Sequence, residues 1–137
     1  MTGDCGVLIV QTVPVRPGLS ATIELDVTEA DTALAMHTGV VPVIATPRIV
    51  ALFEEAAVLA VHGALDDGCS TVGVKVQMEH VAAVPVGGHV TTEATLEKVE
   101  GRRLGFRVSA RDDRGLVAAG KVTRVVVDVE QFLAKTR

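Results

Sequence analysis

Three polar residues occupy positions where the surrounding pattern calls for apolar side chains or a helix cap: Thr46, Glu54 and His80. Glu54 lies between Val50 and Val58, one helical turn away on either side, so its carboxylate must be hydrogen-bonded or line a cleft. His80 ends a stretch of alternating apolar residues. An imidazole titrates near neutrality and a carboxylate can fix its tautomer, so a pair of this kind can activate water as a general base.

Each of these residues also has a purely structural interpretation. Thr46 precedes Pro47 and suits the N-cap position of a helix with proline at N1. Glu54 can be a buried structural glutamate, and His80 a core histidine with satisfied nitrogens. The chemical interpretation depends on Glu54 and His80 both breaking apolar faces near a common layer of the fold.

A long helix is expected to begin at Thr46 and to reach about Leu65, because no glycine interrupts this segment before Gly63. A period of 3.6 residues gives it one wide apolar face. The residues on that face are Ile49, Leu52, Phe53, Ala56, Ala57, Ala60 and Ala64. The opposite side is also largely apolar, which predicts a helix buried on nearly every side.

Five segments alternate between apolar and polar residues and are predicted to be strands: 21–27, 71–80, 89–99, 104–110 and 116–128. Segment 29–37 is expected to form one or two helical turns. Tight turns such as Glu100-Gly101-Arg102 join the later strands, which indicates an antiparallel meander. One helix lying on one face of such a sheet is an α+β fold.

Gly73 interrupts the strand that ends at His80. Alternation places it on the opposite face of that strand from His80. The predicted inward residues are Val72, Val74, Val76, Met78 and His80. A glycine within a strand often permits close approach of a ligand to the backbone, and a β-bulge is the structural alternative.

The chain has 137 residues, 48% of them hydrophobic, which fits one folded domain with a core. Residues 1–19 contain two prolines and are expected to form an N-terminal arm or edge segment, followed by a single domain over 20–137. Residues 40–44 form an unusually apolar loop before the helix, which either packs in the core or lines a pocket. A short sheet and one helix cannot bury all this apolar surface, so a homodimer, or a tetramer, is expected.

Composition argues against several classes of function. Aromatic residues make up 2% and the formal net charge is -4, which disfavours nucleic-acid binding. Cys5 and Cys69 do not have a metal-ligand spacing, and no glycine-rich phosphate loop is present, so no metal and no cofactor are expected. Neither a membrane-spanning stretch nor a signal peptide is apparent, which predicts a soluble cytoplasmic protein.

The chain resembles the hotdog-fold thioesterases, and most closely the fluoroacetyl-CoA thioesterase group. The segments that carry the resemblance are TPRIVALFEEAAVLAV, TVGVKVQMEHVAAVPVGGHV and LEKVEGRRLGFRVSARDD. In that family a threonine precedes the central helix, a glutamate follows eight residues later, and a histidine ends the next strand. These positions fall on Thr46, Glu54 and His80, and the family's strand glycine falls on Gly73. The resemblance implies a curled antiparallel sheet wrapped around one long central helix.

The same resemblance implies hydrolysis of an acyl-CoA thioester. His80 would act as a general base, Glu54 would orient it or itself attack, and Thr46 would hydrogen-bond the substrate or Glu54. The fluoroacetyl-specific family carries a phenylalanine lid over its acyl pocket at the position of Val40, so the smaller valine favours a broader short-acyl-CoA substrate. Arg102 and Arg103 either contact CoA phosphates or belong to a solvated hairpin.

Two other functions fit the same fold. One is a protein that binds acyl-CoA or another small ligand without turnover, which the apolar loop and the apolar helix would also serve. The other is a hydratase or dehydratase, a class that usually spaces its acid and histidine differently. Release of a free thiol from acyl-CoA distinguishes hydrolysis from binding.

Overall fold

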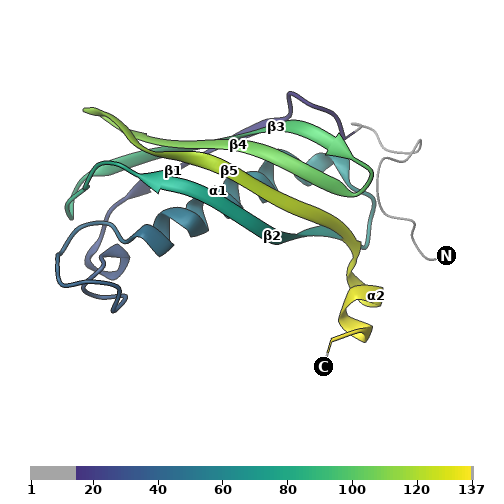
Figure 1. Ribbon diagram of the computed structural model, residues 1–137, viewed down its shortest axis with the longest axis horizontal. Helices are drawn as coiled ribbons and strands as arrows, with labels where there is room; N and C mark the ends of the chain where they lie inside the picture. The colour runs from purple at the N-terminus through teal and green to yellow at the C-terminus, as the bar shows by residue number, and fades with distance from the viewer. Residues whose placement is uncertain (1–14, 137) are drawn as a thin grey trace.

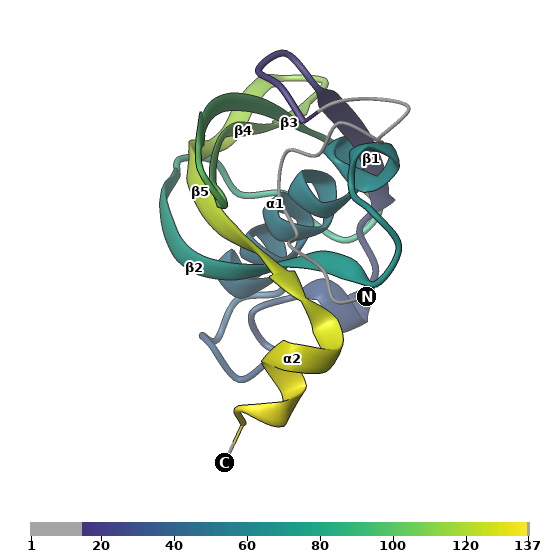
Figure 2. The ribbon, with the colours of Figure 1, turned by 90° about the vertical axis from the view of Figure 1, so that its right-hand side faces the viewer.

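The computed structural model describes residues 15–136. Its main elements are β1 (Ser20–Asp26), α1 (Thr46–Ala60), β2 (Cys69–His80), β3 (His89–Glu100), β4 (Arg103–Asp112), β5 (Gly115–Asp128) and α2 (Val129–Ala134). The five strands form one sheet in the order β1-β3-β4-β5-β2, and every neighbouring pair is antiparallel. This sheet curls around α1 (Figures 1 and 2), which confirms the predicted α+β architecture.

The core lies between α1 and the concave face of the sheet. The helix contributes the predicted apolar face, with Phe53 at its centre, and every residue named on that face is buried. Strands β3 and β4 supply the facing layer with Leu96, Leu104 and Phe106, as their alternation predicts. The helix ends at Ala60, and the rest of the predicted helical segment forms a 3-10 turn over His62–Ala64.

One side of α1 is less buried than the sequence suggests. Ala51 and Leu59 are exposed, although the apolar pattern predicted burial on nearly every side. Figure 2 shows the reason, because the sheet curls around the helix but leaves a side open between its outer strands, β1 and β2. The apolar residues on that open side therefore have no cover within the described part of one chain.

The start of α1 differs from the prediction by one residue. Ala45 is the N-cap, Thr46 is the first helical residue and Pro47 the second, and no side chain caps the helix. Thr46 is therefore not an N-cap, and its hydroxyl remains available for another partner. The preceding segment is held in place by backbone hydrogen bonds from Ile44 to Val84 and from Ala45 to Asp31.

A β-bulge in β2 corrects the predicted face of Gly73. The register with β5 shifts between Gly73, which pairs with Arg124, and Lys75, which pairs with Thr123. The extra residue, Val74, is exposed. Because a bulge adds one residue to the period-two alternation, Gly73 and His80 both face α1. The prediction that these two residues lie on opposite faces was wrong.

The remaining segments are short. The predicted helical turns over 29–37 reduce to a 3-10 turn at Glu29–Asp31 followed by irregular turns. Most of the predicted N-terminal segment 1–19 lies outside the described residues; within the described part, Gly18 and Leu19 extend the backbone pairing to Leu96. Between residues 15 and 136, no helix has the length and apolarity that a bilayer crossing requires.

Candidate active site

The first polar contact of the candidate site joins the beginning of α1 to the end of β2. Thr46 Oγ1 lies 2.8 Å from His80 Nδ1, a hydrogen-bonding distance. Thr46 is exposed and His80 is half-buried, so solvent reaches the hydroxyl. A hydroxyl hydrogen-bonded to an imidazole is the arrangement that converts a weak nucleophile into an active one.

The second nitrogen of His80 has a different environment. His80 Nε2 is buried and has no hydrogen-bonding partner among the described residues. When Thr46 donates its hydroxyl hydrogen to Nδ1, the neutral ring carries its own hydrogen on Nε2. The ring then presents Nδ1 as the basic atom, directed at the Thr46 hydroxyl.

The second polar contact lies farther along α1 and centres on a buried arginine of β5. Arg124 Nη1 donates to Glu54 Oε1 at 2.8 Å, and its Nε and Nη2 donate to the hydroxyl and carbonyl oxygens of Thr71 at 2.8 and 2.9 Å. The Arg124 side chain is 9% exposed and that of Glu54 is 36% exposed. Burial lowers the pKa of Arg124 and the Glu54 carboxylate opposes this, so the guanidinium stays cationic.

Gly73 makes room for the Glu54 carboxylate. A Cβ atom at position 73 would overlap Glu54 Oε1 and would approach Arg124 Nη1 to 3.1 Å. The bulge turns this glycine toward α1, and the missing side chain lets the carboxylate lie against the strand backbone. Gly73 therefore has a steric role that its residue type explains directly.

The structure does not join Glu54 to His80. Their partners are Arg124 and Thr46 respectively, and about 12 Å of helix rise separates Glu54 from Thr46 along α1. We call the line of contacts formed by Thr46, His80, Glu54 and Gly73 the α1–β2 seam. The general-base pair expected from the sequence, imidazole with carboxylate, is replaced by imidazole with hydroxyl, and the carboxylate marks the other end of the seam.

The segment before α1 is fixed to that helix by an ion pair. Arg48 Nε lies 2.8 Å from Asp31 Oδ1, and Asp31 also accepts hydrogen bonds from the backbone and hydroxyl of Thr28. Burial alone would raise the pKa of Asp31, but the hydrogen bonds from Thr28 and Arg48 outweigh it and lower that pKa. Val40, predicted to contact substrate, lies on this loop with 87% of its surface exposed. Its role as a lid stays a prediction.

Sequence reasoning missed Arg124 and Thr71. Arg124 alternates with Val122 and Val126 on the inward face of β5. A charged residue among inward-facing apolar residues is the same feature that singled out Glu54. Such a residue needs a buried hydrogen-bonding partner, so Arg124 could have been predicted to have one. Thr71 carried no such signal, because the bulge that turns it inward is not visible as a break in the alternation.

Comparison with known proteins identifies the family. The model of the fluoroacetyl-CoA-specific thioesterase family matches residues 27–130, more than half of the chain. The chain belongs to this family. A fluoroacetyl-CoA thioesterase of the family from Streptantibioticus cattleyicolor is 42% identical over 95 residues, which cover 69% of this chain and 68% of that protein.

Solved structures agree with this assignment and name the fold. A variant of the fluoroacetyl-CoA-specific thioesterase superposes with a TM-score of 0.84 at 34% identity, covering 90% of this chain and 96% of the other. A hot-dog-like protein from Thermanaerovibrio acidaminovorans gives a TM-score of 0.80 at 27% identity, covering 87% and 88% of the two chains. The hotdog fold expected from the resemblance is therefore confirmed.

The donor types at the seam do not suit a metal ion. Thr46, His80 and Glu54 do not converge, and Glu54 is neutralised by Arg124. Across residues 15–136, no group of three or more His, Cys, Asp or Glu side chains is arranged to hold a metal ion.

Proposed function

We propose that the protein hydrolyses a short or substituted acyl-CoA thioester to the free acid and CoA, with Thr46 and His80 carrying out the attack. The contact of 2.8 Å between the Thr46 hydroxyl and His80 Nδ1 is the observation that carries this proposal. Membership of the thioesterase family supplies the substrate class.

The proposed reaction begins at the hydroxyl. Thr46 Oγ1 attacks the thioester carbonyl carbon while its proton passes to His80 Nδ1. The C–S bond then breaks, and the CoA sulfur leaves with the proton from His80. Water then attacks the resulting ester on Thr46 and gives a proton to His80. The ester C–O bond breaks, the acid leaves, and His80 returns the proton to Thr46 Oγ1. Direct attack by a water activated by His80 is the variant of this scheme that forms no ester.

The position of Thr46 helps the attack. It is the first residue of α1, where the positive end of the helix dipole favours negative charge. An oxyanion formed on a carbonyl attacked at Thr46 lies next to that helix end. A fixed dipole beside the developing charge stabilises a transition state more than a ground state.

Glu54 is proposed to orient the acyl-CoA from the other end of the seam, about 12 Å along α1 from the attacking hydroxyl. Arg124 and Gly73 together fix its carboxylate against β2. The hydrogen bond from Arg124 occupies one carboxylate oxygen of Glu54, which favours positioning over direct attack. A contact between the substrate and Gly73 belongs to the same proposal, because Gly73 is exposed beside Glu54.

A homodimer is proposed to complete the site. Among the described residues, strand β2 lies at the edge of the sheet and pairs with β5 alone, so its outer edge offers backbone groups to another strand. Exposed apolar side chains lie on or next to this open side, namely Leu59, Val74 and Val81. A second copy on this side would cover the seam. Light scattering tests the dimer and its possible pairing into a tetramer.

The deciding experiment measures thiol release from a series of acyl-CoA substrates, including acetyl-CoA and fluoroacetyl-CoA. Hydrolysis by the wild type, lost in Thr46→Val, supports the proposal, and mass spectrometry of Thr46 after rapid quenching detects the ester. Binding of intact thioester without thiol release would instead establish a binding protein. A cytoplasmic location, where acyl-CoA thioesters are made, is part of the same proposal and is tested by fractionation.

A further inference from the structure

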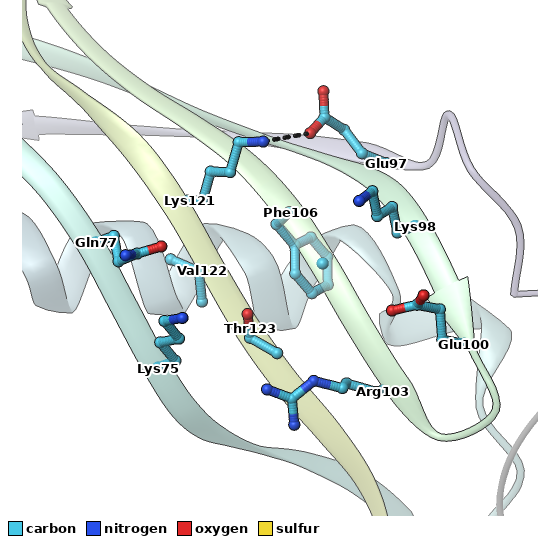
Figure 3. A pocket seen from close by; sticks show the side chains of 11 residues that line it. Lys75, Gln77, Glu97, Lys98, Glu100, Arg103, Phe106, Lys121, Val122 and Thr123 are labelled. Atoms are coloured by element: carbon cyan, nitrogen blue, oxygen red, sulfur yellow. Dashed lines mark ion pairs between the residues drawn. The ribbon is translucent and has the colours of Figure 1, made fainter.

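A hollow of about 190 Å³ lies on the face of the sheet that points away from α1. Figure 3 shows the side chains around it, with the helix behind the strands. The residues that define it come from four strands: Lys75 on β2, Lys98 on β3, Arg103 and Gly105 on β4, and Lys121 and Thr123 on β5. None of them belongs to the α1–β2 seam, so the hollow is separate from the candidate active site.

Strand register explains why the surface is hollowed at this point. One cross-strand row runs from Lys75 to Thr123, then to Gly105 and then to Lys98. The centre of this row carries no side chain at Gly105 and a short hydroxyl at Thr123. The two ends carry long cationic side chains. The result is a depression with lysines at both ends and a hydroxyl on its floor.

Two more cations lie beside the row. Arg103 is two residues from Gly105 on the same strand and face, and Lys121 is two residues from Thr123. Within the part of the chain that the structure describes, Lys75, Lys98 and Arg103 form no ion pair closer than 4.0 Å. The hollow therefore gathers four positive charges on a chain whose formal net charge is -4.

The acidic residues at this face do not cancel that charge. Glu97 is held by Arg107 at 2.7 Å and reaches Lys121 at 4.0 Å, so most of its charge is already compensated outside the four cations. Glu100 lies at the rim, opposite Arg103 in the β3–β4 register. Four cations against these two carboxylates leave a net positive hollow, which attracts anions and concentrates them locally.

We propose that this hollow binds a ligand with at least two linked phosphate groups. Four adjacent strands place the Cα atoms of Lys75 and Lys98 about 14 Å apart, at 4.8 Å per strand. A single phosphate contacts one end of such a row, whereas a diphosphate reaches lysines from both ends over the glycine floor. Lys and Arg side chains are the usual phosphate-binding groups of proteins.

The linked phosphates have two possible sources, a free polyphosphate compound or the diphosphate group of CoA. The binding itself is tested with inorganic pyrophosphate and the full-length protein by titration calorimetry at low ionic strength. We expect saturable binding that weakens with added salt. The double variant Lys75→Gln/Lys98→Gln should weaken it at least about tenfold, the loss expected for a charge-assisted contact.

Two further variants separate the site from general charge effects. Gly105→Val adds no charge but fills the floor, and the site should then bind pyrophosphate at least about tenfold more weakly. A Cβ at position 105 meets only Lys98 Cβ, at an ordinary 3.6 Å, so folding should be preserved. Lys135→Gln removes a positive charge from the end of α2, away from the hollow, and should leave binding unchanged.

Turnover of two substrates then identifies the source of the phosphates. If they belong to CoA, the double variant raises KM for acyl-CoA and leaves hydrolysis of the matching acyl-pantetheine unchanged. If they belong to a separate ligand, pyrophosphate binding falls while both substrates are hydrolysed as by the wild type.

The proposal is overturned if pyrophosphate does not bind the wild type, or if binding survives both Gly105→Val and the double variant. The calorimetry requires no turnover, so its outcome is independent of the proposed hydrolase activity.

Discussion

Two histidines at strand ends have opposite environments. His80 ends β2 with Nδ1 on the Thr46 hydroxyl and Nε2 buried and unpaired among the described residues. His89 begins β3, and both of its nitrogens contact carboxylates, Asp26 at 2.7 Å and Glu24 at 2.6 Å. The His89 side chain is 49% exposed. The same residue type therefore has an uncharged partner in one place and two anionic partners in the other.

The difference shows which histidine can act as a base. Hydrogen bonds from the His89 ring to Asp26, and then to Glu24, raise the pKa of His89, which favours the imidazolium form with both nitrogens protonated. An imidazolium has no lone pair with which to accept a proton. His80 faces a neutral hydroxyl, so its ring can keep an acceptor nitrogen aimed at a nucleophile. The hydrogen-bonding partner of each histidine therefore determines whether its ring can act as a base or serves as a structural cation.

The largest expected effect comes from removing the base. His80→Gln should reduce kcat for acyl-CoA hydrolysis at least about 100-fold, the usual contribution of a positioned general base. Thr46→Val should have an effect of the same order, because it removes the hydroxyl that His80 contacts. Thiol release measures both, and calorimetric melting checks that the variants fold.

The matched control for His80→Gln is the same substitution at the other histidine. His89→Gln removes an imidazole from an equally ordered strand end but should keep nearly wild-type turnover. Equal losses in the two variants would show that the contrast between the histidines has no bearing on catalysis. An unchanged rate in His80→Gln would remove the proposed chemistry altogether.

The next effect concerns the arginine at the other end of the seam. Arg124→Met removes three hydrogen bonds to Thr71 and Glu54 and leaves buried acceptors unpaired, which should cost about 1–3 kcal/mol of the free energy of unfolding. Chemical denaturation measures this cost. Glu54→Gln keeps a hydrogen-bond acceptor for Arg124 and should cost less stability. A more stable Arg124→Met would show that the buried guanidinium is not needed to satisfy these groups.

Much of the fold could be predicted because its signals are local. The apolar period of α1 and the alternation in β3 and β4 place Phe53, Leu96 and Phe106 in the core without reference to distant residues. The choice of site residues depended on the same signal, a polar side chain in an apolar pattern. That signal singled out Thr46, Glu54 and His80, but it does not say which of them touch.

The pairing itself could not be predicted, for two physical reasons. A β-bulge inserts one residue without changing the composition of the strand, so Gly73 seemed to face away from α1. The N-cap shifted by one residue to Ala45, which freed the Thr46 hydroxyl for His80. Each error amounts to a shift of one residue. In β2 the shift changes the face to which Gly73 belongs, and at the start of α1 it changes the partner of Thr46.

A smaller effect tests the steric role of Gly73. Gly73→Ala should lower turnover about tenfold, a loss of about 1.4 kcal/mol of transition-state stabilisation, because the new methyl group must displace the Glu54 carboxylate. Gly63→Ala is the control, since a Cβ at that position meets no atom within 4 Å. Full activity in Gly73→Ala would show that the position of Glu54 does not limit turnover.

The smallest effect returns to His89 and concerns pH. A pKa raised in the folded state means that folding is stabilised most below the unfolded-state pKa, and that this stabilisation is lost as pH rises through the folded-state pKa. Because the cluster is exposed, the change in stability should be slight. Asp26→Asn should lower the pKa of His89, measured by NMR titration of its ring protons, and should flatten the dependence of unfolding on pH in that window.

The pH profile of hydrolysis should be the same in Asp26→Asn and in the wild type, since the His80 contact does not involve this cluster. A profile that moved with Asp26 would mean that the two histidines are coupled, and the contrast between a neutral base and a structural cation would then fail.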